Sequence, residues 1–136
     1  MDTNVFVGAL LRRSSHNRNL LRACLEKRLQ PLMGQALFLE YEHTLSRSEL
    51  FRKSPVSADE RKDLLEAFLS TCEWVQVYFL WRPNLRDETD NHVLELAVAG
   101  GAAAIVTNNV SDFRGCDLRF PDVRIATPKD FLKELV

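Results

Sequence analysis

Residues 103–106, Ala-Ala-Ile-Val, are apolar on every side, and this short run constrains the fold more than any other feature of the chain. Such a run is typical of a parallel strand covered by helices on both faces. Similar short runs occur at residues 32–33, 74–79 and 123–126, and helix-period segments separate them. This alternation predicts an α/β fold with a central, mostly parallel sheet.

The helices are expected where apolar residues recur with the helical period. Their predicted ranges are residues 3–12, 17–29, 35–47, 91–99 and 129–135, and a further helix should begin after the capping-box sequence Ser57-Ala58-Asp59-Glu60. Gly100-Gly101 should end the helix over residues 91–99. With 136 residues, 46% of them hydrophobic, the chain has the size of a single domain over residues 1–136.

Composition excludes several classes of protein. A net charge of -1 excludes a globally basic nucleic-acid binder, so any binding of phosphates must come from local clusters or a bound metal. Three widely spaced cysteines, Cys24, Cys72 and Cys116, favour neither a disulfide framework nor a zinc site. No segment has the pattern of a signal peptide or a membrane span, so we expect a cytoplasmic protein without membrane contact.

Acidic and amide side chains gather where strands are expected to end. Asp2 opens the chain, the run Asp87-Glu88-Thr89-Asp90 precedes a helix, and Thr107-Asn108-Asn109 follows the apolar strand. Glu40 lies on a predicted helix between them. Ligands of parallel sheets bind beyond the carboxyl ends of the strands, and carboxylates gathered there favour a hard cation such as Mg²⁺. The pattern therefore suggests a metal-dependent nuclease.

The order of these motifs resembles the PIN-domain family, and more narrowly the PIN toxins of bacterial and archaeal toxin–antitoxin pairs. The resemblance spans nearly the whole chain, and it rests on Asp2-Thr3-Asn4-Val5, Leu39-Glu40-Tyr41, Asp87-x-x-Asp90-Asn91 with Leu94-Glu95-Leu96-Ala97, and Ile105-Val106-Thr107-Asn108-Asn109 with Asp112-Phe113. It implies a three-layer α/β/α domain with Mg²⁺- or Mn²⁺-dependent ribonuclease activity. It also implies a homodimer and a cognate antitoxin that neutralises it.

The resemblance assigns roles to individual residues. Asp2, Glu40 and Asp90 match the acidic metal ligands, and Asn109 takes the fourth catalytic position, where many members carry an acid. Further candidates for the site are Asn4, Asp87, Thr107 and Asp112, and for Asn4 and Thr107 the alternative is an ordinary turn. For each acid the alternative is ordinary helix capping or a solvated surface position.

Two departures from the family pattern leave a second function open. Asn109 is neutral, and the first strand, which the family pattern places before Asp2, is represented only by Met1. The alternative function is a catalytically impaired PIN-like module that binds RNA or a protein. The two hypotheses differ in whether substitution of Asp90 abolishes an activity.

A basic cluster after the first predicted helix is the best candidate for RNA contact, since arginine and lysine contacts with phosphates supply most non-specific affinity. Its leading members are Arg12, Arg13 and Arg18. The alternative is a solvated helix face. His16, His43 and His92 lack the spacing of a metal cluster, and the sequence indicates structural or surface roles for all three.

Overall fold

The computed structural model describes residues 1–12, 15–77, 91–113, 120 and 122–135. The elements are α1 (Thr3–Leu11), α2 (His16–Leu25), β1 (Leu32–Met33), α3 (Gln35–Leu45), the 3₁₀ helix η1 (Ser48–Phe51), α4 (Ala58–Thr71), β2 (Glu73–Trp74), α5 (Asn91–Ala99), β3 (Ala104–Val106), the 3₁₀ helix η3 (Val110–Phe113), β4 (Arg124–Ala126) and α7 (Pro128–Glu134). The α/β class predicted from the sequence is confirmed.

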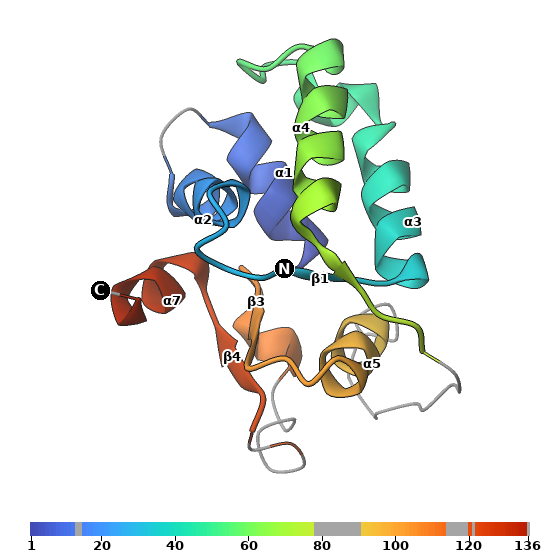
Figure 1. Cartoon of the computed structure of the whole chain (residues 1–136). Helices are drawn as coiled ribbons and strands as arrows, with labels where there is room; N and C mark the ends of the chain where they lie inside the picture. The colour runs from blue at the N-terminus through green and yellow to red at the C-terminus, as the bar shows by residue number, and fades with distance from the viewer. Residues whose placement is uncertain (13–14, 78–90, 114–119, 121, 136) are drawn as a thin grey trace.

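The described strands form two parallel pairs. β1 pairs with β2, and β3 pairs with β4, where Ile105 lies opposite Ile125. The first two residues of the chain lie between the pairs, as the position of the N-terminus in Figure 1 shows. The Asp2 N–H donates to the Val106 carbonyl at 3.0 Å, and the Tyr41 hydroxyl donates to the Met1 carbonyl at 2.6 Å. Met1 and Asp2 therefore link β3 to α3.

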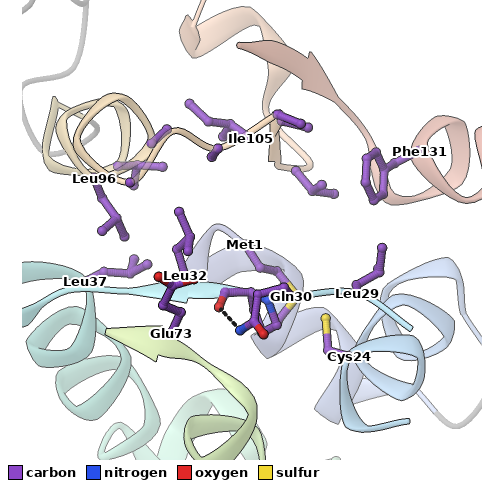
Figure 2. A pocket seen from close by; sticks show the side chains of 18 of the residues that line it. Met1, Cys24, Leu29, Gln30, Leu32, Leu37, Glu73, Leu96, Ile105 and Phe131 are labelled. Atoms are coloured by element: carbon purple, nitrogen blue, oxygen red, sulfur yellow. Dashed lines mark hydrogen bonds between the residues drawn. The ribbon is translucent and has the colours of Figure 1, made fainter. Parts of the chain in front are cut away.

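A cavity of about 400 Å³ separates β1 from β3. Figure 2 shows that apolar side chains face it from both sides, among them Leu32, Leu96 and Ile105. Met1 lies at this cavity, and its amino group is buried there, which lowers the pKa of that amine below 8.0 through loss of hydration.

Local sequence signals explain where the helices begin and end. Ser57 and Glu60 form the predicted capping box, with the Ser57 hydroxyl accepting from the Glu60 N–H at 3.2 Å. Gly101 follows α5 with a φ of +65°, a conformation that glycine adopts without strain. α2 ends at Leu25, whereas the sequence predicted a helix up to residue 29. The reason is Lys27, whose φ of +62° breaks the helical path.

Three aromatic side chains pack α1, α3 and α4 against one another. Phe6 of α1 lies 5.3 Å from Tyr41 of α3 and 5.4 Å from Phe68 of α4, measured between ring centroids. All three side chains are fully buried. In Figure 1, α1, α3 and α4 accordingly stand together on one side of the strands, with α5 on the other. This packing fixes α3, which carries Glu40, beside the N-terminus of α1, which begins next to Asp2.

The remaining strand predictions agree with the structure only in part. Of the strand predicted over residues 74–79, only Trp74 lies in a strand, β2 (Glu73–Trp74); residues 75–77 do not, and residues 78–79 lie outside the described part of the chain. The run at 123–126 forms β4, and Pro128 occupies the first turn of α7 as expected.

Candidate active site

Asp2 is the centre of a hydrogen-bond network at the carboxyl end of β3. Its Oδ1 accepts from the Thr3 N–H at 2.8 Å, so the side chain caps α1. Its Oδ2 accepts from the Thr107 hydroxyl at 2.7 Å and from the Asn4 amide at 3.3 Å. Asp2 is 5% exposed and Thr107 is fully buried. The network holds this carboxylate in one orientation at the strand edge.

Asn4 ties the start of α1 to the turn after β3. Its Oδ1 accepts from the Asn108 N–H at 3.2 Å, and its backbone carbonyl accepts from the Asn108 side-chain amide at 3.4 Å. The Thr107 hydroxyl also accepts from the Asn109 N–H at 3.0 Å. Asn4 and Thr107, both predicted as contributors, are thus part of the framework around Asp2.

Glu40 reaches the site from α3 and is held by His92 of α5. The distance from Glu40 Oε2 to His92 Nε2 is 2.5 Å, and both side chains are partly buried. The sequence predicted a structural or surface role for His92. The structure instead places it in contact with Glu40, a predicted metal ligand, and such a contact can orient a ligand.

The two carboxylates influence each other electrostatically. Burial raises the pKa of Asp2 above 3.8, the Thr107 hydrogen bond opposes this shift, and the negative charge of Glu40 adds to it. Burial also raises the pKa of the Tyr41 hydroxyl well above 10, and the charges of Asp2 and Glu40 contribute in the same direction. Asp2 is therefore a buried carboxylate that lies within the electrostatic influence of the more exposed Glu40.

The other predicted residues fall into two groups. Asp87, Asp90 and Arg13 lie outside the described residues. Asn109 is exposed, and Asp112 sits partly buried in η3, where its N–H donates to the Asn109 carbonyl at 3.0 Å. The contacts around Asp2 include the backbone of Asn109 rather than its side chain.

Of the predicted RNA-contact residues, Arg12 and Arg18 differ in environment. Arg12 is exposed at the end of α1. Arg18 is partly buried, and its Nε donates to the Ala9 carbonyl at 2.9 Å, so this guanidinium braces the last turn of α1.

The sequence did not indicate the surroundings of two residues of α5, His92 and Glu95. His92 contacts Glu40, and Glu95, one helical turn later, is 6% exposed and lines a cavity together with His92. The only sequence signal for these two residues was their position. Both residues follow the acidic run within one turn of each other, on the face of α5 that turns towards α3.

The donor set fits a hard divalent cation. Asp2 and Glu40 offer carboxylate oxygens, which Mg²⁺ and Mn²⁺ prefer. Burial and, to a lesser extent, the charge of Glu40 raise the pKa of Asp2, and a nearby cation would offset both effects. Within the described residues, no three histidine, cysteine or acidic side chains gather closely enough to hold a metal. The third expected ligand, Asp90, lies outside that part of the chain.

Fold and site together define a class of α/β domain in which a buried carboxylate, Asp2, lies at the carboxyl end of a parallel strand. The family model described as PIN domain matches residues 1–111, and the chain belongs to this family. The PIN domain is a three-layer α/β/α fold, and PIN domains are in general metal-dependent nucleases. Searches of curated proteins and of solved structures gave no match. None of the described helices has the length and apolar character needed to cross a bilayer.

Proposed function

We propose that this protein is a metal-dependent endoribonuclease that acts as the toxin of a toxin–antitoxin pair. The observation that carries the nuclease part is the Asp2–Thr107–Asn4 network beside Glu40 in a chain of the PIN-domain family. The proposed metal ligands are Asp2, Glu40 and Asp90, with Mg²⁺ or Mn²⁺ as the cation. The toxin role, the antitoxin partner and the homodimer rest on the resemblance of the motifs to PIN toxins.

Hydrolysis of a phosphodiester requires a water that attacks phosphorus in line with the departing oxygen, and positive charge near the phosphate oxygens. A divalent cation at this site would supply that charge and lower the pKa of the attacking water. The protein's contribution is to hold the carboxylates still. Thr107 and the Thr3 N–H restrain both oxygens of Asp2, and His92 restrains Glu40.

Burial around Asp2 has a second effect on the reaction. With water largely excluded from this carboxylate, its charge interacts more strongly with a nearby cation than it would in bulk solvent. The Tyr41 hydroxyl holds the Met1 carbonyl, so the backbone before Asp2 is fixed as well. These restraints reduce the reorganisation needed when substrate binds.

The alternative is a PIN-like module that binds RNA or a protein without cleaving it. The observation in its favour is the neutral, exposed Asn109 at the position where many members carry an acid. Under this alternative the carboxylates would hold the loops together without supporting hydrolysis.

The deciding experiment is cleavage of a labelled single-stranded RNA in Mg²⁺, Mn²⁺ or EDTA. We expect cleavage with either metal, none in EDTA, and a loss of at least about 100-fold in the Asp90→Asn variant, as expected when a ligand of a catalytic cation is removed. The matched control is Asp63→Asn, the same change at an exposed position of α4, which should retain activity.

A binding measurement separates the two functions. The metal should raise the melting temperature of the unmodified chain and of Asp63→Asn, since a ligand of the folded state stabilises it, and should do so less for Asp90→Asn. Metal binding without cleavage by any variant would favour the binding module. Cleavage that survives in EDTA, or in Asp90→Asn at the full rate, would exclude the proposed site.

The toxin role has its own test. Induced expression of the chain in a bacterial host should arrest growth, and expression of Asp90→Asn should not. If cells expressing the unmodified chain and cells expressing Asp90→Asn grow equally well, while the purified protein cleaves RNA, the nuclease function stands and the toxin role is refuted.

A further inference from the structure

A polar groove of about 490 Å³ lies beside the candidate active site. It is lined by the end of α1, the start of α2, the turn after β3 and the start of α7. Its charged side chains are Arg12 and Lys129, both exposed, and His16 and Asn19 add polar groups. Among the described residues that line it, none is acidic. The groove is therefore a local site of positive charge on a chain whose net charge is -1.

The groove is continuous with the network around Asp2. Asn108 lines it, and the same residue donates from its backbone N–H to Asn4, whose side chain contacts the Asp2 carboxylate. Thr127 and Pro128, which follow β4, also line the groove. Both connections place it beyond the carboxyl ends of β3 and β4, the edge at which parallel sheets bind ligands.

Arg12 and Lys129 are exposed, whereas hydrogen bonds hold in place the end of α1 and the start of α2, which line the groove. Arg18 is used internally, on the Ala9 carbonyl, and this contact holds the end of α1 against α2. Ser15 caps α2 by accepting from the Arg18 N–H at 3.1 Å. Arg12 therefore projects from a braced segment, and Lys129 from the first turn of α7.

We propose that this groove binds phosphate groups of the single-stranded RNA backbone next to the bond that is cleaved. The ligand chemistry follows from the lining. Two cations with neutral amides and hydroxyls, and no carboxylate, suit a phosphodiester backbone and carry no means of reading bases in sequence. The proposal deepens the proposed ribonuclease function and rests on it, since Asn108 places the groove at the same strand edge as Asp2. It predicts that Lys129, which is far from the basic cluster in the sequence, is an RNA contact.

The experiment measures binding of a short fluorescein-labelled single-stranded RNA by anisotropy, in EDTA so that no cleavage occurs. The variant is Arg12→Ala with Lys129→Ala, and the matched control is Arg52→Ala with Lys53→Ala, which removes the same charge from an exposed segment before α4. Each phosphate contact on single-stranded RNA contributes about 0.7 to the slope of log affinity against log salt. Losing two contacts should lower the slope by about 1.4 and weaken binding roughly 25-fold near 0.1 M NaCl.

The control should bind within about twofold of the unmodified chain, and circular dichroism should show that both variants are folded. An equal loss of RNA affinity in the two variants would overturn the proposal, because the net charge of the protein would then explain the effect without the groove. An unchanged slope in the groove variant, or no RNA binding by the unmodified chain, would overturn it too. If the chain cleaves RNA but the groove variant has an unchanged slope, phosphate binding by the groove is rejected and the ribonuclease function stands. The ribonuclease function itself is tested separately by the Asp90→Asn assay.

Discussion

Thr107→Val tests how the site is built, because it removes one oxygen from the centre of the network and preserves the shape of the side chain. The Thr107 hydroxyl is fully buried, donates to Asp2 Oδ2 at 2.7 Å and accepts from the Asn109 N–H at 3.0 Å. Valine places a methyl group against a carboxylate that is 5% exposed. The substitution should therefore destabilise the fold and the site together.

The expected loss follows from the contacts. A hydrogen bond to a charged group contributes about 1.5–3 kcal/mol, and the Asn109 N–H lies near solvent, where water replaces its lost partner. We expect a loss of about 2–3 kcal/mol in the free energy of unfolding at neutral pH. The Thr107 bond lowers the pKa of Asp2, so its removal raises that pKa further. The loss should therefore be largest above the pKa of Asp2 and shrink as the pH falls through it.

Urea unfolding followed by circular dichroism, at neutral and at acidic pH, measures both effects. Thr71→Val is the matched control, since the Thr71 hydroxyl donates to the Phe68 carbonyl within α4 and has no charged partner. The control should lose less than about 1 kcal/mol at either pH, because such back-bonding adds little to a helix. A loss below about 0.5 kcal/mol for Thr107→Val at neutral pH, or no dependence on pH, would refute the assigned role of the hydroxyl.

Three further predictions follow from the surroundings of the site. His92→Ala should weaken Mn²⁺ affinity about 10- to 100-fold in calorimetry by releasing Glu40, and unchanged affinity would remove its positioning role. Burial raises the pKa of Cys72 to about 12, so stability in urea unfolding should fall above pH 9.0, where only the unfolded thiol ionises, and Cys72→Ala should flatten that fall. Acetylating the buried Met1 amine, whose pKa is lowered, should raise the melting temperature below pH 8.0 and have little effect above it; an equal gain at all pH values would contradict this.

The sequence was informative about local structure. The capping box at Ser57, the glycines after α5 and the apolar run of β3 each depend on a few neighbouring residues, and the structure shows all three. The contact between Asp2 and Thr107 was also predictable. Both residues were expected at the carboxyl ends of strands, and in a parallel sheet these ends lie at one edge.

Side-chain partners across elements were not predictable. Glu40 and His92 are separated by 52 positions, and their contact depends on how α3 packs against α5. Nor did periodicity show that Arg18 would brace α1 while Lys129 joined Arg12 at one groove. The early end of α2 depends on a single residue, Lys27, in a conformation that its sequence does not favour.

The contact between Asp2 and Thr107 spans 105 positions of a 136-residue chain. Contacts of such separation form late, because a long loop must close before they contribute stability. The Thr107 N–H in turn donates to the Ala126 carbonyl at 2.9 Å, so the network also needs β4. The Asp2 carboxylate is therefore held in place only when β3 and β4 have paired behind it. Local unfolding of either strand would release the carboxylate, so the site is only as stable as the pairing of these two strands.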